Sequence, residues 1–263
     1  MKKFLIFLAI VLLIGTSYFT YEKWVKHADV GLWSFVPSNS VMIYETNSPL
    51  ATFQEIRETN IWKNLSYIPA FTKVTESLDI LDTLAGKGNF TSFFQNTPTL
   101  ITLDITSSRN IDFLYIVEIQ NLSQQSFVSK AQAYFTQRGY TKRTREYEGF
   151  TITELTGKTP SESFTYIFFK NYFIGSFSAF LVEDAIRTVG DSETPNFQER
   201  NLELNKLTKL TRDQGNAYIN MERVGDLINV ASNQGNKLDL GKSGFLDLKI
   251  TDDIINLSGF TFL

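Results

Sequence analysis

Hydrophobic and polar residues alternate along much of the chain with the two-residue period of β-strands, and segments with helical spacing interrupt this pattern. Single strands are predicted at 41–44 and 216–221. Hairpins are predicted at 98–120, 140–156, 164–178 and 245–262, and polar turns are expected at 107–110, 148–149 and 170–171. Hairpins require antiparallel pairing, because parallel neighbours need long crossover connections.

Apolar residues three or four positions apart predict the helices. The first begins after Asn47-Ser48-Pro49, a second covers 71–85 and stops at Gly86, and a third runs from a Ser123 cap to Gly139. Further helices are predicted at 180–189, 198–212 and 224–231. This order of elements indicates an α+β protein, with one or two antiparallel sheets built from hairpins and helices packed on one face.

The N-terminus has the pattern of a membrane segment. Lys2 and Lys3 precede an unbroken apolar run, and residues 4–21 as a helix would span about 27 Å, against about 30 Å for the hydrocarbon core of a bilayer. We predict a signal-anchor over 1–21 that crosses the membrane through 4–21, with a cleaved signal peptide as the alternative. Residues 22–36 are then a juxtamembrane stalk, and 37–263 form the exported domain.

A short internal similarity divides that domain. Residues 39–45 and 216–222 each form a predicted strand that leads into a helix and, further on, into a hairpin. Two related halves, near 37–139 and 140–263, are one interpretation, and a chance similarity is the other.

Charge and residue content exclude several classes of function. Beyond Lys2 and Lys3 the chain carries 23 basic and 28 acidic side chains. A modestly acidic domain has no electrostatic attraction to a polyanion such as nucleic acid. Cysteine is absent, and His27 in the stalk is the only histidine. Disulfides, cysteine or histidine metal sites and a Ser–His–Asp triad are therefore not expected. We predict no metal, no cofactor and no catalytic residue.

Charged residues on the predicted hairpins allow two interpretations. Asp104, Glu118 and Glu154 would support a carboxylate-dependent hydrolase if one cleft held them together. Alternation along the strands instead makes them the solvent side of the sheet. The basic run 142–145 is typical of an edge strand that is protected against aggregation.

The hairpin at 164–178 departs from simple alternation, because it is apolar on both faces. It is either a central hairpin buried on both sides or an apolar surface for a lipid or a partner. The residues of that candidate surface are Tyr166, Phe168, Phe169, Tyr172 and Phe173.

Trp33, Val36 and Pro37 lead into the strand from Val41, downstream of the basic start and the apolar segment. This layout resembles that of uncharacterised bacterial envelope proteins with a membrane anchor and an exported domain of unknown function. The resemblance implies a place in the bacterial cell envelope, anchored in the inner membrane with the domain in the periplasm, and it transfers no functional residue. We expect a non-enzymatic module that binds another envelope protein or a surface component. A lipid or apolar-ligand carrier is the alternative, and a carboxylate hydrolase is the second alternative.

Overall fold

The structure, a computed structural model, describes residues 30–65, 67–68, 71–72, 75–76, 96–107, 110–158, 163–191, 193–205, 215–232, 241–251 and 254–262. The predicted anchor and most of the helix expected at 71–85 lie outside the described residues.

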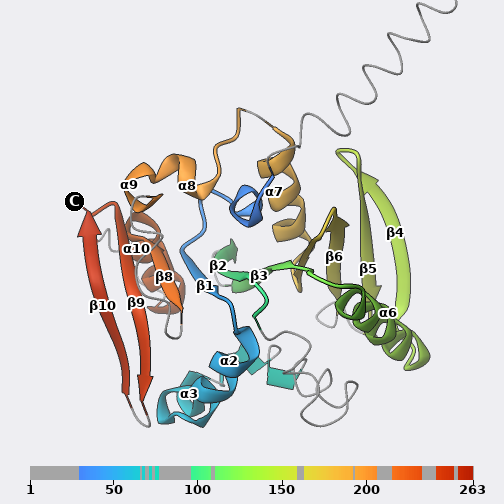
Figure 1. The fold of residues 1–263 in the computed structure, drawn as a ribbon, viewed down its shortest axis with the longest axis horizontal. Coiled ribbons are helices and arrows are strands. Elements are labelled where there is room, and N and C mark those ends of the chain that lie inside the picture. The colour runs from blue at the N-terminus through green and yellow to red at the C-terminus, as the bar shows by residue number, and fades with distance from the viewer. Residues whose placement is uncertain are drawn as a thin grey trace, which may run out of the picture.

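The described strands form one antiparallel sheet of ten strands (Figure 1). They are β1 (Met42–Thr46), β2 (Thr99–Ser107), β3 (Asn110–Glu118), β4 (Thr141–Tyr147), β5 (Phe150–Thr156), β6 (Phe164–Phe169), β7 (Tyr172–Ser176), β8 (Asn216–Asn220), β9 (Ser243–Thr251) and β10 (Ile254–Phe262). Their order across the sheet is β10-β9-β8-β1-β2-β3-β7-β6-β5-β4. All four predicted hairpins and both single strands are confirmed, because hairpin pairing depends on local alternation and turn residues.

The helices follow the predicted pattern less closely. They are the 3-10 helix η2 (Leu32–Phe35) and the α-helices α2 (Pro49–Glu58), α3 (Asn60–Leu65), α6 (Leu122–Gln137), α7 (Ala179–Gly190), α8 (Phe197–Arg200), α9 (Leu202–Asn205) and α10 (Met221–Ser232). The cap of α6 is Asn121, whose side chain accepts a hydrogen bond from the Gln124 amide, and not Ser123. The helix expected at 198–212 is interrupted at Asn201, and 206–214 lie outside the described residues.

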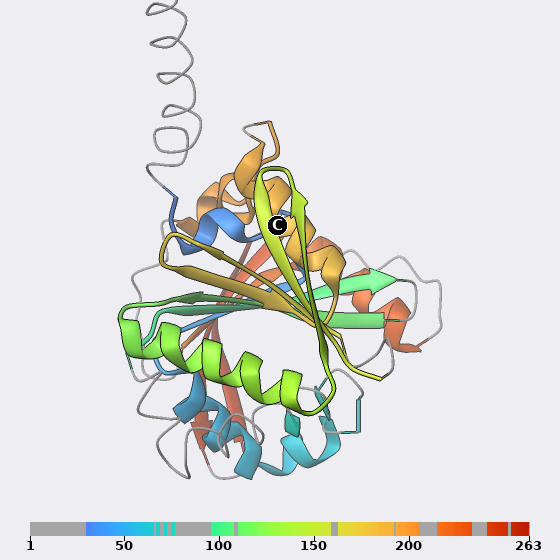
Figure 2. The same cartoon turned by 90° about the vertical axis from the view of Figure 1, so that its right-hand side faces the viewer.

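Helices lie on both faces of the sheet, so the expectation of one covered face is wrong (Figure 2). On the α7 face, Leu181 and Ile186 of α7 share a core with strand residues such as Ile174. On the opposite face, which we call the α6 face, Leu103 and Phe113 form a smaller cluster. The central strands are apolar on both sides, and a sheet that twists by about 20–25° per strand presents neither face as a flat surface for one layer.

Residues 30–36 belong to the domain, which corrects the predicted stalk and the boundary at residue 37. Phe35 and Val36 are fully buried in the core on the α7 face. The Trp33 ring meets Tyr218 edge-on at 4.9 Å, and the Val36 carbonyl accepts a hydrogen bond from the Phe197 amide. The aromatic residues that bury this segment, Phe169, Tyr172 and Tyr218, are distant in sequence, so the local pattern does not reveal its place in the core.

Two parts of the sheet have the same order of elements. A strand, a helical segment and a hairpin follow one another as β1, α2 and α3, β2, β3, and again as β8, α10, β9, β10. The two units lie in mirrored order on either side of the β1–β8 pair, in which Ile43 is opposite Tyr218. The outer side of β3 pairs with β7, whereas no described strand pairs with the outer side of β10. Whether the units arose by duplication stays a prediction.

Candidate functional site

The predicted aromatic surface is divided between the two faces of the sheet. β6 and β7 lie between β3 and β5, and their side chains alternate. Phe169 lies on the α7 face, with ring centroids 6.0 Å from Phe35 and 5.1 Å from Phe150. Tyr172 is buried beside it. Tyr172 therefore belongs to the core on this face, and the partly buried Phe169 packs against it.

The other three predicted residues, Tyr166, Phe168 and Phe173, lie together on the α6 face. Tyr166 is buried under α6, where its hydroxyl donates a 2.8 Å hydrogen bond to Gln132. Phe168 remains 40% exposed, with its ring 5.4 Å from Phe173 and 5.9 Å from Tyr166. Phe173 is also opposite Val117 of β3. Val117, Phe173 and Phe168 thus form a row across three adjacent strands, which we call the apolar row.

A glycine holds the neighbouring rings close to the sheet. A side chain at Gly175 of β7 would meet the Phe164 ring at 2.7 Å. The Phe164 and Phe173 rings are nearly parallel, with centroids 6.4 Å apart. Aromatic side chains that lie over a strand glycine fix strand register, so the apolar row rests on a rigid platform.

The three carboxylates proposed for a hydrolase do not come together. Asp104 is buried, accepts a hydrogen bond from the Thr102 hydroxyl and is opposite Asp112. Burial raises the pKa of Asp104 to about 6, although the Thr102 hydrogen bond lowers it. Glu118 is at the other end of β3, about 20 Å from Asp112 at the rise of a strand, and accepts a hydrogen bond from Asn171.

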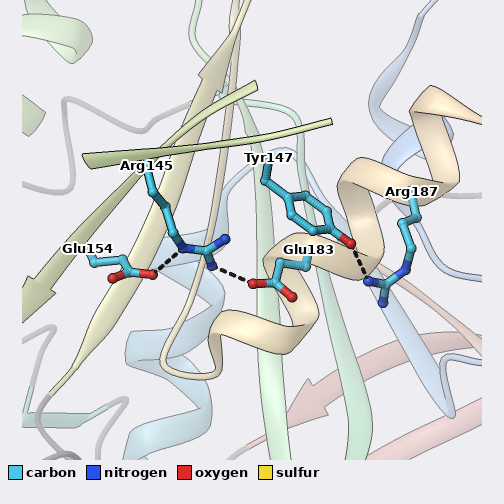
Figure 3. Close-up of polar contacts among 5 residues, drawn as sticks. All are labelled: Arg145, Tyr147, Glu154, Glu183 and Arg187. Carbon is cyan, nitrogen blue, oxygen red and sulfur yellow. Dashed lines mark hydrogen bonds and ion pairs between the residues drawn. The ribbon is translucent and has the colours of Figure 1, made fainter. Parts of the chain in front are cut away.

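Glu154, the third acid, belongs to a polar network that the sequence did not reveal (Figure 3). Arg145 of β4 donates a 2.7 Å hydrogen bond to Glu154 of β5 and a second to Glu183 of α7. Arg187, one helical turn after Glu183, donates a 2.7 Å hydrogen bond to the Tyr147 hydroxyl. We call these five residues the clasp, because they join the β4–β5 hairpin to α7.

The clasp consists of charge-assisted hydrogen bonds that connect β4, β5 and α7. The hydrogen bond to Glu154 raises the pKa of the Arg145 guanidinium, and Glu183 adds to this effect. Arg145 contacts both carboxylates, and partly exposed ion pairs of this kind contribute modestly to stability. Arg145 and Tyr147 share a strand face, and Glu183 and Arg187 a helix face. No local spacing shows that these two faces meet.

The outermost strand β10 forms a second unusual surface (Figure 1). Its nine residues include no ionisable side chain and no proline. Ile254 and Phe260 are 58% and 57% exposed. Long, uncharged edges are uncommon, because an open strand offers backbone groups to any other strand.

The chain matches no family model, no curated protein and no solved structure. In the part of the chain that the structure describes, no helix is long and apolar enough to cross a membrane. No three acidic or histidine side chains gather as a metal site within those same ranges.

Proposed function

We propose that this chain is a non-enzymatic protein of the bacterial cell envelope, anchored in the inner membrane by residues 4–21, whose exported domain binds another envelope protein. The observation that carries the proposal is the apolar row, in which a large aromatic side chain, Phe168, remains 40% exposed on a rigid platform. The anchor rests on the sequence pattern alone.

The row has the properties of a binding anchor and not of a scattered surface residue. Phe168 and Phe173 are directly opposite on adjacent strands, so little conformational freedom is lost when a partner covers them. Aromatic residues on such platforms dominate protein interfaces, where truncation of one ring commonly costs about 2 kcal/mol of binding free energy. Val117 extends the same surface onto β3.

The lipid-carrier alternative has less support. It required the aromatic residues of the hairpin to gather around one ligand, whereas Phe169 and Tyr172 pack in the core on the other face. The hydrolase alternative has no convergent pair of acids among Asp104, Glu118 and Glu154. The carrier remains as an outcome of the experiment below.

Site-specific photo-cross-linking in cells tests the proposal. A photoreactive phenylalanine analogue replaces Phe168 in one full-length chain and Phe180 in another. Phe180 is the matched control, because it is 47% exposed and lies on α7, on the opposite face. We expect one envelope protein to be cross-linked from position 168 and absent from position 180.

Three results would contradict this expectation. Lipid adducts at position 168 would favour the carrier, the same proteins at both positions would indicate non-specific contact, and no adduct would remove the row as a binding surface. The anchor is tested separately. The full chain should stay with membranes in a carbonate wash and keep its N-terminus, and release by the wash would contradict the anchor.

A further inference from the structure

We propose that two copies of this chain associate through β10, with the two strands antiparallel about a two-fold axis at Ser258. This surface is independent of the proposed function. Seven strand steps separate β10 from β6 and the apolar row, a distance of about 34 Å at ordinary strand spacing.

The outer strands of the two similar units, β3 and β10, differ in their strand partners. β3 and β10 hold the same place in the two units described above, each as the last strand of its hairpin. The outer side of β3 accepts the antiparallel strand β7, over five residue pairs from Leu114–Ser176 to Glu118–Tyr172. The equivalent side of β10 pairs with no described strand. The position that accepts an antiparallel strand in one unit therefore has no described strand partner in the other.

The lack of charge on β10 favours pairing with a second copy of the same strand. An edge that pairs with a copy of itself must tolerate its own side chains directly opposite, and like charges in that position are destabilising. β10 has no ionisable residue between Ile254 and Phe262, so self-pairing brings no like charges together. The other edge, β4, carries Lys142, Arg143 and Arg145, and self-pairing there would oppose cations.

Ser258 is the central residue of β10, so an axis there lets the two strands pair over their full length. A two-fold axis at Ser258 pairs residue 254 with 262, 256 with 260, and Ser258 with itself. Over half of the Ile254 side chain is exposed, and this register places it opposite Phe262 of the second copy, a residue that packs partly against the core. The pairing covers nine residues, the same length as the β9–β10 pairing within the chain.

The chain offers a clean chemical test because it has no native cysteine. Residues directly opposite in an antiparallel pair have Cα atoms about 4.5–5.5 Å apart, which is within the range that a disulfide spans. Full-length Ser258→Cys should therefore form a disulfide-linked dimer on mild oxidation. The control is Thr144→Cys, at the exposed centre of β4, which should cross-link at least ten-fold more slowly.

Register is tested with two further variants, Asn256→Cys and Phe260→Cys, carrying different tags. Mixed together, they should form the mixed dimer faster than either forms a homodimer. The reason is that residue 256 is opposite 260 in the proposed register, whereas two copies of 256 lie about 13 Å apart along the strands. Equal rates for all three products would overturn the register.

A variant without cysteine tests association directly. Ser258→Lys places two cations at the axis, so the full chain in detergent should sediment as a monomer at concentrations where the wild type is a dimer. Circular dichroism confirms that the variant is folded. A wild-type monomer, equal cross-linking of Ser258→Cys and Thr144→Cys, or cross-linking of Ser258→Cys to a different protein would each overturn the proposal.

Discussion

The two edge strands of the sheet, β4 and β10, have opposite side-chain chemistry. β4 carries four charged side chains and is held by the clasp to α7, whereas β10 carries none and contacts the sheet through β9. Both edges leave one side of a strand without a described strand partner. Charge on an edge discourages pairing with other chains, and its absence permits pairing. The two edges therefore differ in side-chain chemistry and not in the lack of a described strand partner, and this difference is why we propose β10, and not β4, as the docking edge.

The largest expected effect separates β10 from its own sheet. A side chain at Gly259 would lie 1.8 Å from the Phe245 carbonyl oxygen of β9, and backbone atoms cannot yield as a flexible side chain does. Gly259→Ala should therefore cost about 3 kcal/mol of unfolding free energy or more. Urea denaturation measures this change. Gly190→Ala is the control, because no atom lies within 4 Å of the added carbon. Equal stability of the two variants would contradict the close β9–β10 approach.

Asp104, on a central strand of the sheet, should make the free energy of unfolding depend on pH. Burial raises the pKa of Asp104 from 3.8 to about 6, with Asp184 raising it further and Arg223 lowering it. Asp112 is the acid directly opposite. The folded state thus holds a proton that the unfolded chain has lost between these values. Its stability should fall by about 2 kcal/mol as the pH rises from 4 to 7.

Asp104→Asn should remove that fall, so it should be more stable than the wild type at pH 7 and closest to it at pH 4. Urea titrations of both proteins across this range measure the difference. A wild type that gains stability relative to Asp104→Asn with rising pH would contradict the raised pKa.

Breaking the clasp should have a smaller effect. Arg145→Ala leaves Glu154 and Glu183 without their shared cation, at a cost of about 1 kcal/mol, because the group is 35% exposed and solvent screens it. The loss should shrink in 1 M salt. Lys142→Ala is the matched control, because Lys142 is exposed on the other face of the same strand and is opposite Leu155, and it should change stability by less than about 0.5 kcal/mol. Equal losses in the two variants would mean that the clasp does not hold the edge.

The smallest expected change in stability comes from removing charges from β4, and it tests whether charge keeps this edge from pairing. Replacing Lys142 and Arg143 together by threonine gives β4 fewer charges, while unfolding free energy should change by less than about 0.5 kcal/mol. Self-association of the full chain, followed by light scattering in detergent, should nevertheless increase. If it does not, charge is not what keeps β4 from pairing.

Sequence reasoning succeeded where structure depends on neighbours along the chain. The turn at Glu148 and Gly149 has positive φ at both residues, 49° and 78°, as a tight hairpin requires, and it lies where it was predicted. The apolar runs on either side of the turn at Lys170 and Asn171 also placed β6 and β7, although their division of aromatic residues between two faces became clear only from the sheet.

Contacts between distant segments could not be derived in this way. Glu183 is 38 residues from Arg145, so neither half of the clasp reveals the other. Phe35 resembled a stalk residue because its aromatic neighbours, Phe169 and Tyr172, follow far along the chain. The exposure of β10 depends on strand order, which alternation does not encode.

The position of β1 between β2 and β8 has a consequence for the time course of folding. The Tyr218 hydroxyl donates to Glu45 across 173 residues, so one side of β1 is completed only after most of the chain exists. At ordinary synthesis rates of roughly 5–20 residues per second, this interval lasts on the order of 10–30 s. During it, β1 is an edge of the growing sheet, on the side where the finished sheet has β8. The nascent chain therefore passes through a stage with an open central strand that the finished protein never shows.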